Sequence, residues 1–472
     1  MVNRGRGGRR NQRPNRAQHH HNSTTATTTR TRTVAASVSV AEELSGTTLP
    51  DELILEVLYR TPVKTLVTFR CVSKSWLALT FDPRFISMHL SCNALLNKHT
   101  LYHAYATDFK AKTLSLLRNV DEPPNDVYVL KPSQPRKLDY PRKFNFPNFF
   151  KEMAFCGSVN GIVCLSHSQH PDSGYFVEWG RFCVLWNPAM NCCKTIKLPD
   201  KKTVLDMWEI VSVGIGFDAV ANDYKIIRIV PVSYPPSSKE NIMSRVEIYS
   251  ANRDSWKDIN GGALIPFCPG LPNCNFVIKG VPYWHVWGRE NKGLGAIDPR
   301  TGMHREIPYP DYVKNQRTDA HPVNLLDSVS LLIYSPGQDP NHLVDVYVLD
   351  ETCGLWTKKY TTQPIVAEGL RLPQCLTTGQ IVVETWEGGD SDHRSTFFYD
   401  PSSSSLSAKF DASNTLWYQS YSHVESLVCL KGMEPLEKEA KEDKKRKKKP
   451  IKKNWDEFLS EGFELVLRFI EV

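Results

Sequence analysis

Residues 49–90 read LPDELILEVLYRTPVKTLVTFRCVSKSWLALTFDPRFISMHL. Within this stretch Ile54, Leu55 and Leu58 recur at helical spacing and form one apolar stripe. Residues that favour the starts of helices are spaced along it: we expect caps at Asp51, Thr61 and Ser73, and a further start at Asp82-Pro83. The pattern therefore predicts three or four short helices, with Pro62 at the first position of the second one.

This stretch carries more apolar surface than a unit of its size can bury by itself. Very small units rarely fold well alone, and an apolar face that nothing covers is usually a docking face. On pattern alone two interpretations stand, a docking module or the helical start of a larger domain.

The residues themselves closely resemble the F-box family. The runs LPDELILEVL, PVKTL, FRCVSKSW and DPRF agree with that family in identity and spacing. The resemblance implies an F-box over residues 47–91, which would bind a Skp-type adaptor and through it a cullin ubiquitin ligase. It implies adaptor binding by Leu49, Pro50, Ile54, Leu58, Pro62, Val63, Leu66, Val72 and Trp76. Thr61 departs from the family, which usually has leucine before this proline, so we expect one adaptor contact to be slightly weaker.

The composition is that of a globular body with basic tails. The chain has 472 residues, 41% of them hydrophobic, and a net charge of +7, which leaves room for two or three domains. The positive charge is concentrated in residues 1–46 and 441–453, so the body between them is mildly acidic. The cysteines contain no CxxC pair and no signal peptide follows Met1. We therefore expect reduced thiols, a location in the nucleus or cytoplasm, and no membrane partner.

Three terminal segments are predicted to lie outside the folded body. Residues 1–46 have the composition of a disordered basic tail. Residues 436–453 form a basic linker whose cluster KEDKKRKKKPIKK suits either nuclear import or a solvated connection. Residues 454–472 place apolar side chains at helical spacing, which predicts an amphipathic helix that packs back on the body.

Residues 92–435 repeat one β pattern, in which an apolar strand, a turn and a second strand follow one another. The five copies are VLWNPAMNCCKTIKLP (184–199), VEIYSANRDSWKDI (246–259), AIDPRTGMHREIPYP (296–310), VDVYVLDETCGLWTKKY (344–360) and FFYDPSSSSLSAKF (397–410). Regular strands with internal repetition predict a large all-β domain, a β-propeller with a β-sandwich as the alternative. The fold class is therefore α+β multidomain, a small all-α unit before a β-repeat domain, and the number of blades stays open.

The β region is similar to the plant F-box-associated domain, a relative of kelch propellers. The similarity lies in CGSVNGIVCLS (156–166), VGIGFDAVANDYKIIRIV (213–230), VESLVCL (424–430) and the first two hairpins above. The strict kelch signature is not met, because Gly261-Gly262 and Gly388-Gly389 lack its flanking residues. In that family the domain holds the substrate without a common binding motif, so the substrate-binding residues stay unknown.

One loose motif for a bound cofactor occurs in the β region. Gly214 to Ala219 fits the dinucleotide fingerprint GxGxxA, but a turn at Asn222-Asp223 and a second strand follow, where the fingerprint needs a helix. The glycines are better explained by tight β packing. We expect no cofactor.

Two further clusters have the residue types of a binding site. Cys164, His167 and His170 have metal-like spacing but no fourth ligand, so we expect no metal. The aromatic run Tyr283, Trp284, His285 and Trp287 is better explained as core than as a ligand face. With no recognisable acid-base or nucleophile set, we expect no catalytic residues and no enzyme.

The leading hypothesis is a substrate-recognition subunit of a Skp-cullin-F-box ubiquitin ligase, with a target protein of unknown identity. The alternative is a ligand- or glycan-binding propeller that acts outside a ligase. An RNA-binding role through the basic tails is a third hypothesis, which the mildly acidic body disfavours.

Overall fold

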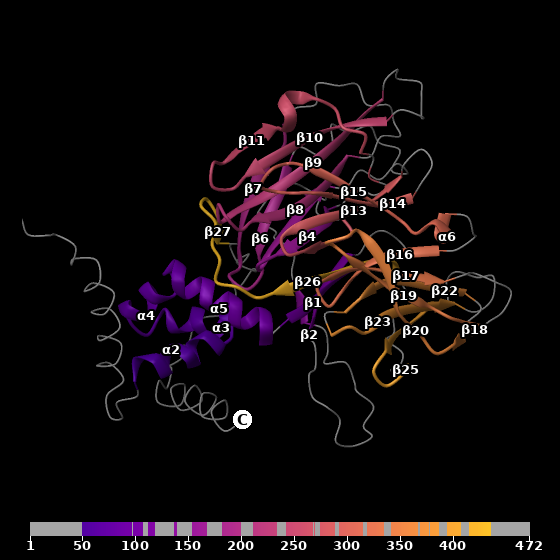
Figure 1. Cartoon of the computed structure of the whole chain (residues 1–472). Coiled ribbons are helices and arrows are strands. Elements are labelled where there is room, and N and C mark those ends of the chain that lie inside the picture. Colours follow the sequence, from indigo (N-terminus) through magenta and orange to yellow (C-terminus); the bar gives the residue numbers. More distant parts are fainter. Residues whose placement is uncertain are drawn as a thin grey trace, which may run out of the picture.

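The computed structural model describes residues 50–96, 98–106, 112–118, 136–138, 153–167, 182–199, 211–233, 242–267, 269, 274–287, 292–314, 319–334, 341–366, 369–376, 378–386, 394–406 and 415–435. The predicted segments 1–46, 436–453 and 454–472, and Leu49, lie outside these residues. Figure 1 shows a group of helices at one end of a β-propeller.

The helices form a helical unit over residues 50–96. They are α2 (Asp51–Arg60), α3 (Val63–Phe69), α4 (Lys74–Leu79) and α5 (Pro83–Leu96). Ser73 is a cap as predicted, since its side-chain oxygen accepts a bond from the backbone N–H of Trp76 (3.2 Å). Asp82, where a further start was predicted, accepts from the backbone N–H of Arg84 (2.7 Å). The cap predicted at Asp51 is wrong, because Pro50 holds that position and Asp51 begins the helix.

The propeller has five four-stranded antiparallel sheets and one five-stranded antiparallel sheet within the described residues, here numbered as blades 1 to 6. Blade 1 holds β4 (Met153–Val159), β5 (Ile162–His167), β6 (Phe182–Asn187) and β7 (Cys192–Lys197), with β27 (Glu434–Pro435) added at its edge. Blade 2 holds β8 (Ser212–Asp218), β9 (Asp223–Ser233), β10 (Ile242–Ser250) and β11 (Ser255–Asp258). Blade 3 holds β12 (Phe276–Ile278), β13 (Val281–Trp287), β14 (Lys292–Ile297) and β15 (His304–Pro308).

The remaining blades follow the same order of strands. Blade 4 holds β16 (Asp319–Leu325), β17 (Ser328–Tyr334), β19 (Asp345–Asp350) and β20 (Leu355–Thr361). Blade 5 holds β22 (Gly369–Cys375), β23 (Ile381–Trp386), β24 (Arg394–Asp400) and β25 (Ser405–Leu406). Blade 6 holds β26 (Thr415–Val424), β1 (Lys98–Ala106), β2 (Lys112–Arg118) and β3 (Arg136–Leu138). Short elements between blades are η3 (Ile259–Gly262), α6 (Asp311–Lys314), β18 (Asn341–His342) and β21 (Ile365–Val366).

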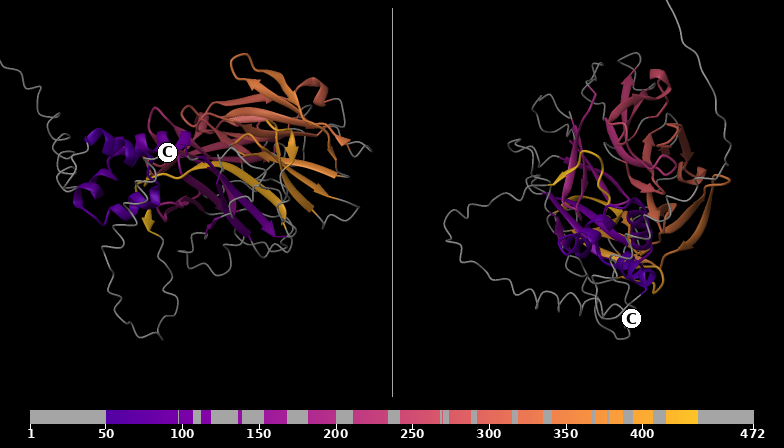
Figure 2. Two further views of the ribbon diagram at one scale, coloured as in Figure 1. Left: turned by 90° about the horizontal axis from the view of Figure 1, so that it is seen from below. Right: turned by 90° about the vertical axis from the view of Figure 1, so that its left-hand side faces the viewer.

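Blade 6 closes the ring with strands from both ends of the propeller sequence. β26 pairs antiparallel with β1, from Lys98 opposite Val424 to Tyr105 opposite Trp417. β26 also contacts β4 and β22, the inner strands of blades 1 and 5, and the right-hand view of Figure 2 shows the sheets around a common centre. Because α5 ends shortly before β1 begins, the helical unit leads directly into the closing blade.

The five predicted β copies are the outer hairpins of blades 1 to 5, which confirms the repeat and the propeller and makes the sandwich alternative wrong. Four of their turns contain the same type of side-chain hydrogen bond. A side-chain Oδ1 accepts a bond from the backbone N–H two residues later, which fixes the turn locally. The four residues are Asn187 (3.0 Å), Asp298 (2.7 Å), Asp350 (2.8 Å) and Asp400 (2.8 Å).

The hydrophobic core lies between the faces of neighbouring blades. One cluster joins blades 1 and 2, a second joins blades 3 and 4, and a third joins blades 4 and 5. Trp284 of blade 3, which is fully buried, packs in a further cluster with Phe155 of blade 1 and Tyr421 of blade 6. Blades 1 to 5 thus bury their sheets against their neighbours. Among the described helices, none is long and apolar enough to cross a membrane.

Candidate functional site

The predicted adaptor-binding residues divide into buried and exposed side chains. Leu58, Val63 and Leu66 are 3%, 1% and 1% exposed. They form the core of the helical unit together with Phe85. Because these three side chains are enclosed by the unit itself, they support a docking surface from inside, and direct contact with an adaptor stays a prediction for them.

The other members of the predicted set lie nearer the surface. Pro50, Pro62 and Val72 are exposed, and Val72 is 63% exposed. Ile54 and Trp76 are half-buried in the same cluster as the buried residues. The Trp76 ring meets Phe69 edge-on, with 4.8 Å between the ring centroids. These residues offer an apolar surface that is held in place by the core beneath it.

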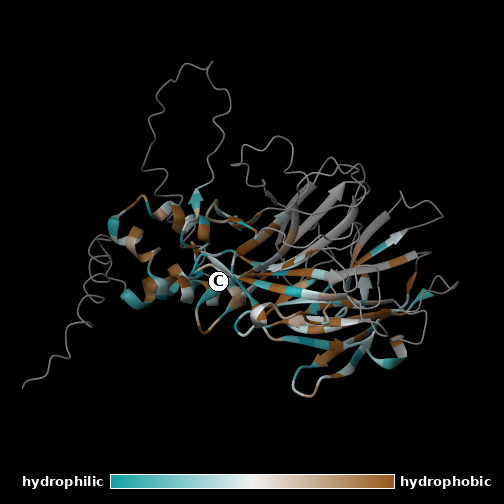
Figure 3. Ribbon diagram, turned by 90° about the horizontal axis from the view of Figure 1, so that it is seen from above, coloured by the Kyte–Doolittle hydropathy of each residue, from teal (hydrophilic) through white to brown (hydrophobic). Residues whose placement is uncertain are grey.

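The helical unit also exposes apolar side chains that were not predicted. They are Leu95 (85%), Leu53 (53%), Phe81 (53%), Met88 (48%) and Leu77 (39%). Figure 3 shows hydrophobic and hydrophilic residues alternating along these helices. Helical periodicity identifies the stripe of residues that faces the core, such as Ile54 and Leu58. Apolar residues beside that stripe do not fit the period, so the pattern does not identify them. A small unit with this much exposed apolar surface is suited to docking a partner.

Thr61 lies inside the helical unit, so its departure from the F-box pattern is accommodated internally. Its side chain is 8% exposed and its Oγ1 donates to the Val57 carbonyl at 2.8 Å, so it does not cap α3 as predicted. The Thr61 carbonyl accepts from His89 Nε2 at 2.9 Å, and His89 Nδ1 accepts from Asn93 Nδ2 at 3.0 Å. This network uses the neutral imidazole, and burial lowers the pKa of His89.

Arg70 fixes the turn between α4 and α5. Its Nε donates to Thr80 Oγ1 at 2.8 Å, and its guanidinium carbon lies 4.3 Å from the centroid of the Phe81 ring. A guanidinium over an aromatic face is attractive, so Arg70 holds the exposed Phe81 in one position.

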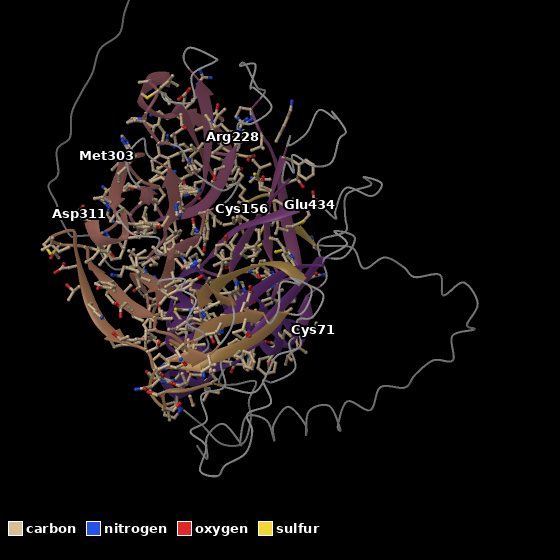
Figure 4. All side chains as sticks on the ribbon, turned by 90° about the vertical axis from the view of Figure 1, so that its right-hand side faces the viewer. Cys71, Cys156, Arg228, Met303, Asp311 and Glu434 are labelled. Atoms are coloured by element: carbon tan, nitrogen blue, oxygen red, sulfur yellow. The ribbon has the colours of Figure 1, made fainter. Side chains whose placement is uncertain are left out.

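The helical unit and the propeller share one hydrophobic cluster. Ala189 and Met190, in the β6–β7 turn of blade 1, and Leu427 pack with the core residues of the helical unit. Leu427 is 1% exposed and lies in the return segment, residues 425–435, which follows β26 and runs back past the helices. Figure 4 shows Glu434, near the end of this segment, on the opposite side of the molecule from Met303. The shared cluster fixes the orientation of the two units.

Asn187 is the polar centre of this junction. The fully buried side chain donates from Nδ2 to the carbonyls of Ser426 (2.9 Å) and Val428 (2.8 Å). Its Oδ1 accepts from the backbone N–H groups of Ala189 (3.0 Å) and Met190 (3.1 Å). One amide therefore holds both the turn and the return segment, and each of these contributes to the cluster shared with the helices.

The glycines of the GxGxxA motif serve packing, as predicted. A Cβ on Gly214 would lie 2.6 Å from the Trp284 ring, and one on Gly216 would lie 2.9 Å from Pro299. The motif lies on β8 and is followed by a turn and β9. Blade 3 therefore approaches blade 2 more closely than a side chain at these positions would allow.

The other two clusters belong to the core as far as the structure describes them. Tyr283 and Trp284 are 2% and 0% exposed, which confirms their predicted core role. Cys164 is fully buried next to Cys183, and the side chains of His167 and His170 lie outside the described part. No group of three His, Cys, Asp or Glu residues within the described ranges could hold a metal ion.

Comparison with protein families agrees with this two-part structure. Residues 47–87 match the F-box domain, and residues 176–298 match the F-box associated beta propeller domain. The fold and these matches define a class, in which a helical docking unit precedes an interaction propeller. The chain therefore contains an N-terminal F-box domain and, C-terminal to it, an F-box-associated β-propeller domain.

Proteins from Arabidopsis thaliana are similar to this chain over much of its length. F-box protein CPR1 is 24% identical over 89% of this chain and 100% of its own length. An F-box/kelch-repeat protein is 21% identical over 79% of this chain and 95% of its own length. F-box/WD-40 repeat-containing protein 1 is 28% identical over 67% of this chain and 69% of its own length.

Solved structures show only remote likeness. The β-propeller domain of the Trilobed protease from Pyrococcus furiosus is 11% identical over 55% of this chain and 70% of that chain, with a TM-score of 0.30. A GH43 β-1,3-galactosidase is 11% identical over 56% of this chain and 94% of that chain, with a TM-score of 0.32. At such scores the activities of these enzymes are not carried to this chain. In general, the presence of an F-box domain supports two conclusions, namely that the protein binds a Skp-type adaptor and that it recognises substrates for a ubiquitin ligase.

Proposed function

We propose that this protein is the substrate-recognition subunit of a Skp-cullin-F-box ubiquitin ligase in the nucleus or cytoplasm. The helical unit docks the Skp-type adaptor, the adaptor links it to a cullin, and the propeller binds a target protein. The chain itself contributes no reactive group. Its effect on the reaction is proximity, because it holds the target close to the ubiquitin-loaded enzyme.

The observation that carries this proposal is the exposed apolar surface of a helical unit that is fixed to the propeller. Val72, Phe81 and Leu53 are each more than half exposed, while the core beneath them is closed. The shared cluster around Leu427 then sets where a target on the propeller lies relative to the adaptor. A recognition subunit needs both features, a docking face and a defined orientation.

The test is adaptor binding by a pair of matched variants. Val72→Asp places a carboxylate on the proposed docking face, and Val220→Asp makes the same change in a blade 2 turn, where the side chain is 72% exposed. Losing a buried valine contact costs about 1.5 kcal/mol or more, and burying an unpaired carboxylate costs further energy. We expect Val72→Asp to weaken adaptor binding at least about tenfold, and Val220→Asp to leave it unchanged.

Exposed residues are required for a clean result. Leu58→Asp would bury a charge in the core of the helical unit and unfold it, so lost binding would carry no information about contact. Equal adaptor affinity of Val72→Asp and the unchanged protein would remove this face as the docking site. If Phe81→Asp on the same unit also bound normally, the ligase role itself would be rejected.

A further inference from the structure

Three side chains from separate elements meet where the helical unit joins the propeller. Cys192 begins β7 of blade 1, Cys429 lies in the return segment, and Arg70 follows α3. Asn187, which lies opposite Cys192 in the β6–β7 pairing, donates to the carbonyl of Val428 at 2.8 Å, so the neighbouring Cys429 lies beside the strand that carries Cys192. The positive charge of Arg70 acts electrostatically on both thiols.

The two thiols differ in access to solvent. Cys429 is exposed, whereas Cys192 is 5% exposed and lies behind it. Cys192 Sγ also lies 3.7 Å from Met433 Sδ, and Pro435 in β27 pairs with Cys192 in β7. These two contacts hold the return segment along blade 1 after Cys429, and the bond from Asn187 to the Val428 carbonyl holds it before Cys429. An oxidant reaches Cys429 first, and the second thiol is already in place.

The surroundings give the two thiols different roles. The hydrogen bond from Cys192, aided by the positive charge of Arg70, lowers the pKa of Cys429 to about 6 against the effect of burial. The same bond, together with burial, raises the pKa of Cys192. The lowered pKa favours the thiolate of Cys429, the nucleophilic form, while the raised pKa of Cys192 favours its thiol.

We propose that Cys429 and Cys192 form a peroxide-sensitive thiol pair that reversibly locks the return segment onto blade 1. The Cys429 thiolate attacks one oxygen of hydrogen peroxide, which gives a sulfenic acid and releases hydroxide. The Cys192 thiol then attacks that sulfur, so that a disulfide forms and water leaves. Two thiols lose two electrons in total, and the peroxide is reduced to two molecules of water.

The lock acts on the element that joins the two units. Leu427, two residues before Cys429, is buried in the cluster shared with the helical unit. β26, which precedes the segment, is the inner strand of the closing blade. A bond between blade 1 and the segment after blade 6 makes the ring closure covalent, and cross-links that close long loops restrict the unfolded chain strongly.

The experiment uses the full chain, reduced and then treated with hydrogen peroxide at pH 7. Peptide mapping without reductant is expected to give a Cys192–Cys429 cross-linked peptide that dithiothreitol removes. In Cys192→Ser the sulfenic acid on Cys429 has no partner and is expected to accumulate as its dimedone adduct. Cys353, an exposed cysteine in blade 4, is the internal control for accessibility.

The contribution of Arg70 is tested with a milder probe. At pH 7 iodoacetamide is expected to modify Cys429 several-fold faster than Cys353. Arg70→Gln is expected to reduce that preference, and Arg70→Lys, which keeps the positive charge, to retain most of it. Oxidation of Cys429 no faster than Cys353, or peroxide products that lack the Cys192–Cys429 bond, would overturn the proposal. Because these readouts are chemical, they are independent of adaptor binding.

Discussion

Replacing Asn187 with alanine tests how the F-box is joined to the propeller. The side chain is fully buried and makes four hydrogen bonds, two within its own turn and two to the carbonyls of Ser426 and Val428 in the return segment. Asn187→Ala removes all four and leaves the partner groups in a closed junction. Asp298 provides the matched control, since its Oδ1 makes the same two turn bonds in blade 3, to Arg300 and Thr301.

The expected magnitude follows from the difference between the two sites. Each buried polar group that loses its partner costs about 1–3 kcal/mol. The turn of Asp298 is exposed, so Asp298→Ala should cost about 1 kcal/mol. Asn187→Ala should cost about 3–5 kcal/mol, a large part of the stability of a domain. Asn187→Asp keeps the turn bonds but turns an oxygen toward two carbonyls, so we expect at least the same loss.

The assay is amide hydrogen exchange followed by mass spectrometry, with thermal unfolding beside it. In Asn187→Ala we expect faster exchange in the return segment and in the β6–β7 turn, and a lower Tm than in Asp298→Ala. The other blades should keep their protection, because they make no bond to Asn187 among the described contacts. Equal exchange and equal Tm in the two alanine variants would refute the reasoning that this amide holds the junction.

Two further outcomes concern stability. Because burial lowers the pKa of His89 below the value of about 6.5 in an unfolded chain, acid favours the unfolded state, so F-box stability should fall as pH drops from about 7 to below the folded pKa. His89→Gln, which keeps a donor for Thr61, should flatten this dependence in urea unfolding at several pH values, and an unchanged slope would contradict the assignment. Gly214→Ala should cost about 1–3 kcal/mol, because its Cβ would lie 2.6 Å from the buried Trp284 ring, and a Tm equal to that of the unchanged protein would show that the blades can separate at no cost.

Local patterns carried the prediction of the fold. The helical stripe of Ile54 and Leu58 and the cap at Ser73 depend on residues a few positions apart, and the structure has them as expected. The propeller repeats were equally visible, because turns such as that at Asp298 are fixed by bonds that span two or three residues. The prediction of helix caps was less accurate, because the Thr61 hydroxyl donates to the preceding helix instead of capping the next one.

The docking surface was predicted only in part. Periodicity marks apolar residues on one side of a helix, but it does not show whether that side faces the unit's own core. Leu58 and Leu66 proved to be buried, whereas Phe81 and Leu53, outside the predicted set, are exposed. Which apolar residues stay open depends on how the four helices pack, and therefore on contacts between distant positions.

The amino-acid sequence by itself determined the helices, the repeating hairpins and the resemblance to the F-box family. Each of these depends only on residue identity and on spacing over a few positions. The tertiary structure alone decided how many blades close the ring, and that β26 closes it with β1. It alone brought Asn187 to the return segment, and Cys192 to Cys429. These pairs stand far apart in the chain, and only the closed ring of blades, which brings its last strand beside its first, places them in contact.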